Sequence, residues 1–300
     1  MSRRAKINAK KRNRRIILIS VAAVIVVASV AFALLISSTF NSPLSSYIYK
    51  PIPSSLYQQI TGVSDSTLSA VGSPSSVTGP SSVAGTPLTS NGKPEVLYIG
   101  GDYCPYCAVE RWALILALSH FGNFTGIQYM LSSATDINAN TPTFTFSSPS
   151  FNYTSQYVSF VPVEEYNRTS ETTVWHALTT TEQSVFSKYG SGGFPFIDLG
   201  NQYVINGVQT TIDLSGQNWT QIASQLSNSS SSVAQGIDGA ANKIITAVCK
   251  IDGSVPSSVC SQSFATVTLA YVPGGSGSTS LAVSTTPPAN RMSEKTRWTT

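Results

Sequence analysis

The chain has 300 residues, and only 11% of them are charged, whereas a soluble globular protein has roughly 25%. Its four cysteines and two histidines are too few for a disulfide-dense scaffold or a His-rich metal protein of this length. Eight of the 18 lysines and arginines lie in the first 15 residues, so the rest of the chain has 10 against 14 Asp and Glu. This balance disfavours a nucleic-acid-binding protein, and we expect no nucleic-acid partner.

The N-terminal segment predicts a membrane anchor. After the basic residues 1–15, Ile16–Ile36 form an uncharged run of 21 residues, and a helix of about 20 apolar residues spans a bilayer. The positive charge on the N-terminal side places residues 1–15 in the cytoplasm and the rest outside the cell membrane. A cleaved signal peptide ending near Ser37 and Ser38 is the main alternative, and a buried core helix is another.

The sequons of the chain agree with export. Five N-x-S/T triplets follow the apolar run and none precedes it, as expected of a glycoprotein with an extracytoplasmic C-terminal domain. An exported chain can also keep stable disulfides. The candidate glycosylation sites are Asn123, Asn152, Asn167, Asn218 and Asn228.

Residues 37–85 predict an extracytoplasmic stalk with short helices. Residues 54–72 resemble two helices, with Ser54 and Ser64 as candidate N-caps and Gly72 as a stop signal. The Ser/Pro/Gly-rich run over 73–90 has the composition of a flexible linker.

A single α/β domain is expected over residues 86–272. Asn91-Gly92 predicts a hairpin turn before a buried strand at Val96–Ile99. Apolar residues at three- and four-residue steps predict a helix within Tyr103–Phe121, and Ile127–Leu131 resemble a second core strand. The later expected elements are strands at Thr143–Phe146 and Gln156–Val163, a helix at Glu182–Tyr189, a hairpin of Phe194–Leu199 and Gln202–Ile205 about Gly200-Asn201, helices between Asn218 and Lys250, an ambiguous segment at 257–272, and a disordered tail at 273–300.

The Cys104-Pro105-Tyr106-Cys107 motif lies between the first strand and the long helix. A helix N-terminus offers free N–H groups and a positive dipole end, which stabilise a thiolate on Cys104. Pro105 suits the first helical position, since no N–H is needed there. Cys107, almost one turn later, can attack a mixed disulfide formed by Cys104. The motif therefore predicts thiol–disulfide exchange.

Other interpretations of the motif remain open at this point. It could be half of a zinc site, although Cys249 and Cys260 do not have the spacing of the other half. A c-type haem site needs a histidine where Ala108 stands, and His120 lies roughly 24 Å along the same expected helix. His176 is not excluded as a partner, and a purely structural local disulfide is a further alternative.

The unit of strand, CPYC and helix, followed by Gly193-Phe194-Pro195-Phe196-Ile197-Asp198, resembles the thioredoxin superfamily. More narrowly, YCPYCAVERWALILALSHFGNF, YVSFVPVE and GGFPFID, together with the anchor, are similar to an archaeal family of membrane-anchored thioredoxin-like proteins catalogued as a domain of unknown function. The resemblance implies a thioredoxin-like fold in which a cis proline, here Pro195, begins a strand and faces the dithiol.

The resemblance also implies roles for particular residues. A substrate peptide would pair with the loop before Pro195, and Pro105, Tyr106 and Phe194 would line its groove. Two features depart from the pattern. Residues 133–180 form an insertion of about 45 residues, and Tyr98 stands where the superfamily has a buried acid.

The missing acid leaves the proton acceptor for Cys107 undecided. Glu110, one helical turn after Cys107, is a candidate substitute. The alternative is a solvated glutamate on the helix face, or one paired with a nearby cation.

Cys249 and Cys260 are separated by turn-forming residues. In an oxidising compartment a structural disulfide between them is expected, worth on the order of 3 kcal/mol in the chain-entropy model. A shuttle pair relaying electrons to or from the CPYC dithiol is the alternative.

The sequence thus predicts a membrane-anchored extracytoplasmic thiol–disulfide oxidoreductase without an organic cofactor or a resident metal. Its partners would be thiols and disulfides of exported proteins and, in addition, a membrane electron-transfer protein. Oxidase, isomerase and reductase are not distinguished by the motif. The rival hypotheses are a non-catalytic thioredoxin-like binding module at the cell surface and a metal-binding protein.

Overall fold

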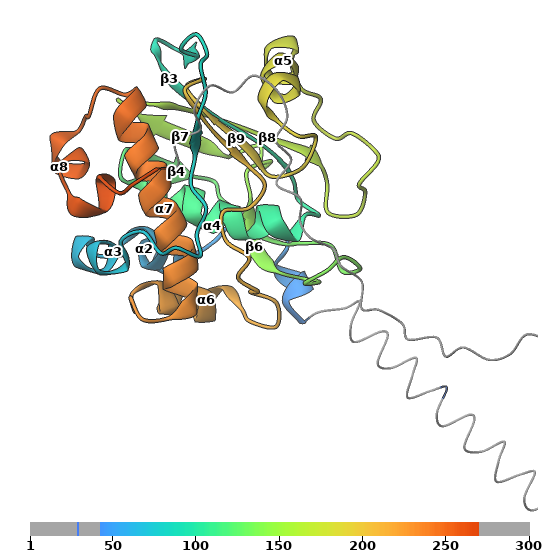
Figure 1. Ribbon diagram of the computed structural model, residues 1–300. Helices are drawn as coiled ribbons and strands as arrows, with labels where there is room; N and C mark the ends of the chain where they lie inside the picture. The colour runs from blue at the N-terminus through green and yellow to red at the C-terminus, as the bar shows by residue number, and fades with distance from the viewer. Residues whose placement is uncertain (1–28, 30–42, 270–300) are drawn as a thin grey trace, which may run out of the picture.

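The computed structural model describes residue 29 and residues 43–269 (Figure 1). Its central sheet has six strands, and β3 (Lys93–Gly101) lies in the middle. β3 pairs in parallel with β8 (Ser159–Tyr166) and antiparallel with β9 (Phe196–Leu199). The remaining strands are β10 (Tyr203–Asn206) beside β9, β1 (Ser81–Ser82) beside β10, and β2 (Thr89–Ser90) beside the start of β3.

Alternation along β3 gives the sheet two apolar faces. Val96 and Tyr98 belong to the main core, whereas Leu97 and Ile99 belong to a smaller one, as expected because successive strand residues point to opposite faces. Helices α4 (Pro105–Ser119) and α7 (Ser232–Ile251) contribute to the main core. Helix α5 (Thr180–Tyr189) contributes to the smaller one and lies apart from α7 in Figure 1. The domain is therefore a mixed α/β sheet with helices on both faces.

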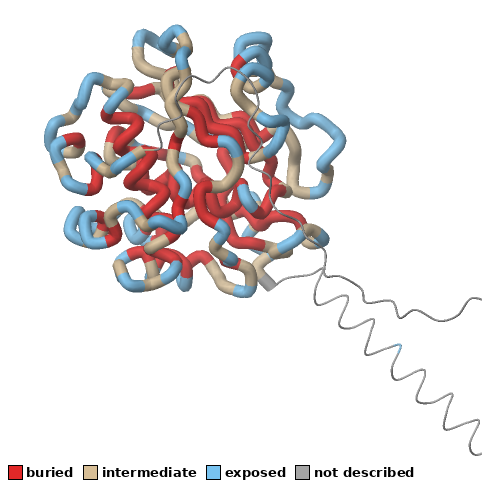
Figure 2. The backbone as a smooth tube through the Cα atoms, viewed as in Figure 1, coloured by how far each residue is buried: buried red, intermediate tan, exposed pale blue. Residues whose placement is uncertain are grey.

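Helix α4 is buried around nearly its whole circumference. It packs on α7, α2 (Ser54–Thr61) and two short strands, β4 (Gly122–Thr125) and β6 (Pro142–Thr145). Figure 2 shows this buried interior in red. The sequence predicts the helix but only one apolar face, because the elements that cover the other faces come from distant parts of the chain.

The described part of the expected stalk is instead packed into the domain. Leu56, Ile60 and Leu68, from α2 and α3 (Asp65–Val71), are buried in the main core, as is Val77 after them. Their apolar side chains lose contact with water by covering α4, α6 and α7. Of the predicted stalk with short helices over residues 37–85, the two helices are present as α2 and α3, but the described residues 43–85 pack on the domain and do not stand apart from it as a stalk.

The two caps predicted for these helices have different outcomes. Ser64 accepts the N–H of Thr67 as an N-cap, and Gly72 ends α3 with a positive φ, as predicted. Ser54, however, is the first residue of α2, whose N-cap is Pro53 without a side-chain bond. The N-cap prediction for Ser54 is therefore wrong. A 3-10 helix, η1 (Pro43–Tyr47), precedes α2.

The segment between α4 and β8 forms two additional strand pairs, one enclosed by the other along the chain. β4 pairs with β7 (Asn152–Ser155), and β5 (Gln128–Leu131) pairs with β6, both antiparallel. The strand predicted at Ile127–Leu131 thus exists as β5, but in a separate two-stranded sheet. β8, assigned to the insertion over 133–180, is a strand of the central sheet, so that insertion is shorter than predicted.

Both predicted hairpin turns are confirmed. Asn91 and Gly92 have positive φ, and so do Gly200 and Asn201. Asparagine and glycine are the residues that adopt this conformation at least cost.

The C-terminal part of the described chain is helical. α6 (Trp219–Leu226) and α7 occupy the predicted range, and the ambiguous segment contains α8 (Ser257–Cys260) and a 3-10 helix, η2 (Ser263–Ala265). The predicted tail at 273–300 lies outside the described residues, as does the predicted anchor at Ile16–Ile36 apart from Ser29. Among the helices of the described residues, none is long and apolar enough to cross a membrane.

Candidate functional site

Cys104 is the N-cap of helix α4. β3 ends at Gly101, and α4 begins with Pro105, as the motif predicts. The Sγ atom of Cys104 accepts the backbone N–H of Cys107 at 3.2 Å. The sulfur thus takes the position of a capping oxygen and satisfies one of the free N–H groups at the helix start.

Both cysteines of the motif are buried, Cys107 more completely than Cys104. Both cysteines are free thiols, but Cys104 is 5% exposed and Cys107 is fully buried. Tyr106 between them is 39% exposed. Only a narrow edge of Cys104 therefore faces solvent.

The surroundings of the two thiols also give them different pKa values. The pKa of Cys104 is lowered, first by its hydrogen bond with the Cys107 side chain and then by backbone N–H groups and the Arg111 cation, against the opposing effect of burial. Burial first, and the neighbouring sulfur second, raise the pKa of Cys107 well above its usual range. Cys104 is therefore the thiol that ionises first.

The carbonyl group of Phe194, which precedes Pro195, lies near Cys104 although Phe194 follows it by 90 residues. The Sγ–H of Cys104 donates weakly to the carbonyl oxygen of Phe194 at 4.0 Å. The Phe194–Pro195 peptide bond is cis, and Pro195 directly precedes β9. The half-buried ring of Phe194 packs between Tyr166 and Phe186, with both centroids at 5.8 Å. The structure thus brings together the dithiol and the proline loop, as the resemblance implied.

Glu110 is buried rather than solvated. It is 0% exposed, and one carboxylate oxygen accepts the N–H of Gln209 at 3.1 Å, while the other has no hydrogen-bond partner among the described residues. Burial raises its pKa to about 7. The alternative of a solvated or ion-paired helix-face residue is therefore wrong. Glu110 follows Cys107 by three residues on the same helix, a spacing at which two side chains can be neighbours.

A buried charge cluster beneath the motif was not predicted from the sequence. Arg111 donates from Nε and Nη2 to Glu164 of β8 at 2.8 and 2.6 Å, and from Nη2 to the carbonyl oxygen of Gly101 at 2.8 Å. Asp102 lies 3.6 Å from the same guanidinium and accepts the hydroxyl of Thr145. Burial, and then repulsion from Glu164, raise the pKa of Asp102 to about 8.

One signal in the sequence could have revealed part of this cluster. Arg111 follows Cys107 by one turn on a helix whose other residues are mostly apolar, so a buried cation was foreseeable. Its partner Glu164 is 53 residues away in sequence, and no local pattern connects the two.

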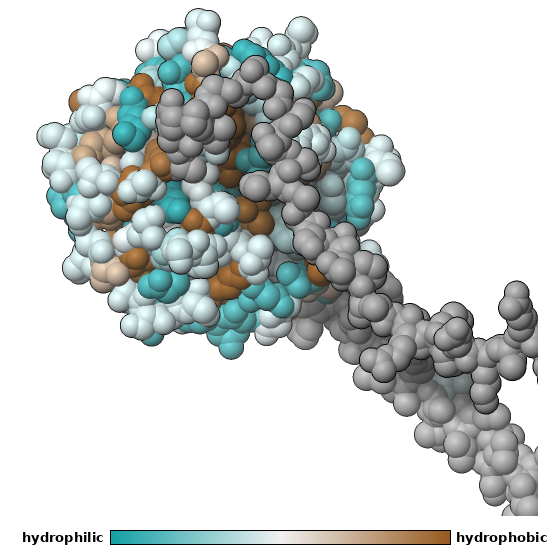
Figure 3. All heavy atoms as spheres, viewed as in Figure 1, coloured by the Kyte–Doolittle hydropathy of each residue, from teal (hydrophilic) through white to brown (hydrophobic). Residues whose placement is uncertain are grey.

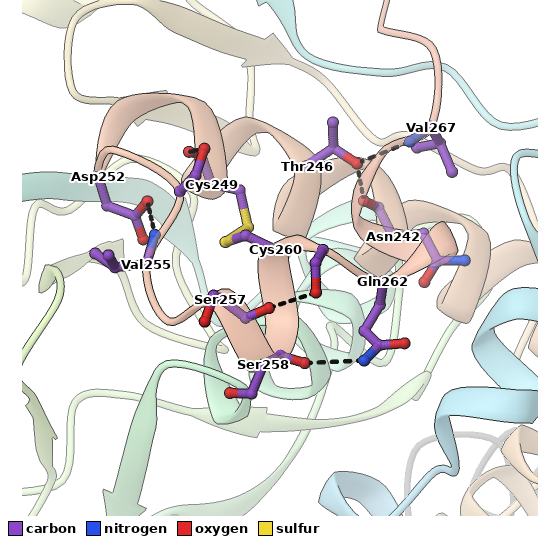
Figure 4. The surroundings of a disulfide bond; sticks show 12 residues. Asn242, Thr246, Cys249, Asp252, Val255, Ser257, Ser258, Cys260, Gln262 and Val267 are labelled. Carbon is purple, nitrogen blue, oxygen red and sulfur yellow. Dashed lines mark hydrogen bonds between the residues drawn. A yellow bond between two sulfur atoms is a disulfide. The ribbon is translucent and has the colours of Figure 1, made fainter.

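Cys249 and Cys260 form a disulfide, as predicted (Figure 4). It joins the end of α7 to α8, with the two Cα atoms 5.6 Å apart. These sulfurs are not free to complete a zinc site with Cys104 and Cys107. Elsewhere in the described chain, no group of three or more His, Cys, Asp or Glu side chains is arranged to hold a metal.

The five sequons differ in their surroundings. Asn123 and Asn152 are exposed on the paired strands β4 and β7. Asn218 instead caps α6, where its side chain accepts the N–H of Gln221. The side chains of Asn167 and Asn228 accept backbone N–H groups two residues later. Occupancy of these five sites stays a prediction.

A comparison with known protein families matches most of this domain to one family model. The family model described as "Domain of unknown function (DUF929)" matches residues 80–250. The chain belongs to this family. The matched range includes the six strands of the central sheet, the dithiol and nearly all of α7. No curated protein and no solved structure matches the chain.

Proposed function

We propose that this DUF929 protein is a thiol–disulfide oxidoreductase of thioredoxin-like fold that acts on protein cysteines through Cys104 and Cys107. The observation that supports this most is the asymmetry of the two thiols. Cys104 caps a helix with a lowered pKa and keeps an edge to solvent, whereas Cys107 is fully buried with a raised pKa. One sulfur suited to attack and a second suited to resolve are what exchange through a mixed disulfide requires.

The chemistry runs through one mixed disulfide. When the 104–107 pair is oxidised, a substrate thiolate attacks the sulfur of Cys104, the Cys104–Cys107 bond breaks, and Cys107 leaves as a thiolate that takes up a proton. A second substrate thiolate then attacks the substrate sulfur in the mixed disulfide and releases Cys104 as a thiolate. The substrate loses two electrons and the dithiol gains them. The reverse sequence reduces a substrate disulfide, and the redox partner sets the direction.

The proline loop supplies the proposed substrate site. The carbonyl oxygen of Phe194 lies next to the sulfur of Cys104, and residues 191–193 before it are exposed. An extended substrate backbone can pair with such a loop while its cysteine reaches Cys104. Tyr106 and Pro105 would border the bound peptide on the other side of the sulfur.

We place the domain outside the cell membrane, anchored by Ile16–Ile36. This rests on the basic residues 1–15, the apolar run after them and the position of the sequons. Its partners would be exported proteins and, in addition, a membrane protein that exchanges electrons with the dithiol. No organic cofactor is needed for this chemistry.

Figure 3 shows hydrophilic and hydrophobic side chains interspersed on the face in view, with many residues near the middle of the hydropathy scale.

The experiment is to trap the mixed disulfide. A Cys107→Ala variant of the full chain, expressed in cells that export it, should accumulate adducts with exported proteins that dithiothreitol releases. Cys104→Ala is the matched control and should give none. If Cys107→Ala forms no adducts while its Cys104 is still alkylated in the folded protein, the oxidoreductase proposal is wrong. If a Cys104→Ser variant also retains the function in cells, a binding module explains the domain better.

A further inference from the structure

Tyr98 has a buried hydroxyl group without a partner. The residue is 0% exposed on β3, and its Oη atom makes no hydrogen bond within the described residues. An unpaired buried hydroxyl destabilises the folded protein, and such groups are rare enough to call for an explanation. The ring itself is well packed, edge-to-face on Phe146 with centroids 5.6 Å apart. It is therefore the hydroxyl, rather than the ring, whose presence needs a reason.

The unpaired hydroxyl lies beside the sulfur of Cys107. A Cβ atom placed on Gly100 would come within 2.2 Å of Tyr98 Oη and 3.1 Å of Cys107 Sγ. The oxygen and the sulfur are thus separated by no more than the sum of these two distances. Because Gly100 has no side chain, the Tyr98 hydroxyl and the Cys107 sulfur can both lie next to its Cα atom.

The other polar groups near this space have partners at some of their atoms but not at all. The guanidinium of Arg111, whose Cζ lies 5.8 Å from the centre of the Tyr98 ring, is bonded through Nε and Nη2 to Glu164 and to the Gly101 carbonyl, while its Nη1 has no hydrogen-bond partner within the described residues. Asp102 accepts the Thr145 hydroxyl. Burial raises the pKa of Tyr98 well above its usual range, so the hydroxyl keeps its proton. Tyr98 is therefore a neutral donor and not a base.

We propose that the hydroxyl of Tyr98 donates a hydrogen bond to the thiolate of Cys107 and so positions and stabilises it for the resolving step. This inference rests on the proposed function and deepens it. In that step the Cys107 thiolate attacks the Cys104 sulfur of the mixed disulfide, a Cys104–Cys107 bond forms, and the bond to the substrate sulfur breaks. The electron pair leaves with the substrate thiolate. Tyr98 keeps its proton throughout, while the proton of the Cys107 thiol passes to a separate base, for which Glu110 is the candidate.

The proposal accounts for the residue at position 98. A tyrosine there supplies a hydrogen bond to a buried thiolate without adding a second charge next to it. Hydrogen bonds to charged groups are stronger than neutral ones, so the bond gains strength when Cys107 ionises. The sulfur of a thiol is only a weak acceptor, so the hydroxyl gains a strong partner when Cys107 ionises.

The test uses a reagent that reports both cysteines in turn. Reduced full-length protein is mixed with the aromatic disulfide 5,5′-dithiobis(2-nitrobenzoate). Attack by Cys104 releases one coloured thiolate in a first phase, and attack by Cys107 on the resulting mixed disulfide releases another in a second phase. At a pH where Cys107 is mostly protonated, we expect the second phase to slow about tenfold in Tyr98→Phe, because the lost hydrogen bond lowers the fraction of Cys107 present as thiolate, and we expect its pH profile to move to higher pH. The first phase should change less than twofold.

Tyr189→Phe is the matched control. The hydroxyl of Tyr189, on α5, is also buried and has no hydrogen-bond partner in the part of the chain that the structure describes, so this variant removes the same group elsewhere and should leave both phases unchanged. A second phase that is equally fast in Tyr98→Phe and wild type, or slowed equally in Tyr189→Phe, overturns the inference while leaving the proposed function intact. If folded wild-type protein shows no first phase, the proposed function fails and this inference fails with it.

Because phenylalanine keeps the packed ring, both variants should unfold at denaturant concentrations close to wild type. If Tyr98→Phe does not fold, the wild-type chain with 3-fluorotyrosine in place of tyrosine, a stronger donor, should show a faster second phase, and an unchanged rate overturns the inference.

Discussion

Replacing Glu110 by glutamine tests the role of the buried carboxyl group in both stability and exchange. Burial raises the pKa of Glu110 from 4.5 to about 7, and the N–H of Gln209 is its only hydrogen-bond donor within the described residues. The folded protein therefore binds this proton more tightly than the unfolded chain. As a result, stability falls as the pH rises from about 4.5 to about 7 and then levels off. The difference between the two pKa values corresponds to about 3 kcal/mol.

Glutamine keeps the acceptor for Gln209 but cannot titrate. Glu110→Gln should therefore match wild type at pH 4.5 and exceed its free energy of unfolding by up to about 3 kcal/mol at pH 8. Urea unfolding at both pH values, with the disulfide intact, measures this. The other buried carboxyl groups titrate equally in both proteins, so the difference between them isolates position 110. An equal difference at pH 4.5 and pH 8 would refute the reasoning.

The same variant tests proton transfer. If Glu110 accepts the proton of Cys107, the release of the second coloured thiolate should slow at pH 7 in Glu110→Gln, while the first release stays as in wild type. If the rate of the second release is unchanged, Glu110 does not accept the proton of Cys107, and its carboxyl group affects only the stability of the fold.

Three further changes have expected outcomes. Gly100→Ala places a methyl group against Tyr98 and should cost about 1–3 kcal/mol of stability by overpacking; a urea midpoint equal to wild type would contradict the close approach. Glu164→Gln removes the carboxylate that is hydrogen-bonded to the buried Arg111 cation and leaves only Asp102, at 3.6 Å, beside it among the described residues; it should cost up to about 3–5 kcal/mol, and thermal unfolding at the wild-type temperature would contradict this buried ion pair. Replacing both cysteines of the 249–260 disulfide by serine should cost on the order of 3 kcal/mol while sparing exchange at the CPYC motif; loss of exchange in folded protein would instead support the shuttle alternative.

Local chemistry made part of the fold predictable. Asn91-Gly92 and Gly200-Asn201 specify tight turns because these residues accept positive φ, and the structure has both. The start of α4 was equally predictable, because Pro105 suits the first helical position and the sulfur of Cys104 can accept a free N–H group at the helix N-terminus. These signals specify where β3 gives way to the motif and where α4 begins.

Contacts between distant segments were not predictable. Asn242 of α7 donates to the carbonyl oxygens of Leu68 and Gly72, about 170 residues earlier. This contact helps fix α3 on the core, yet the composition of the segment before β2 predicted a stalk. β8 was likewise assigned to an insertion, because nothing near it in sequence shows that it pairs with β3.

The candidate site shows the same division. Cys104 and Cys107 were identified from spacing alone, and Phe194 and Pro195 from resemblance. The burial of Glu110 and the Arg111–Glu164 pair depend on side chains from several elements, so a single sequence could not reveal them.

The pH dependence of alkylation at Cys104 tests the central claim most directly. Reduced, folded protein would be treated with iodoacetamide across pH 5 to 10, and each cysteine would be followed by peptide mass spectrometry. The account predicts that Cys104 reacts with a midpoint below the value of about 8.5 of an ordinary thiol, while Cys107 stays protected. A Cys104 midpoint at or above that value, or no reaction of either thiol until the protein unfolds, would contradict it.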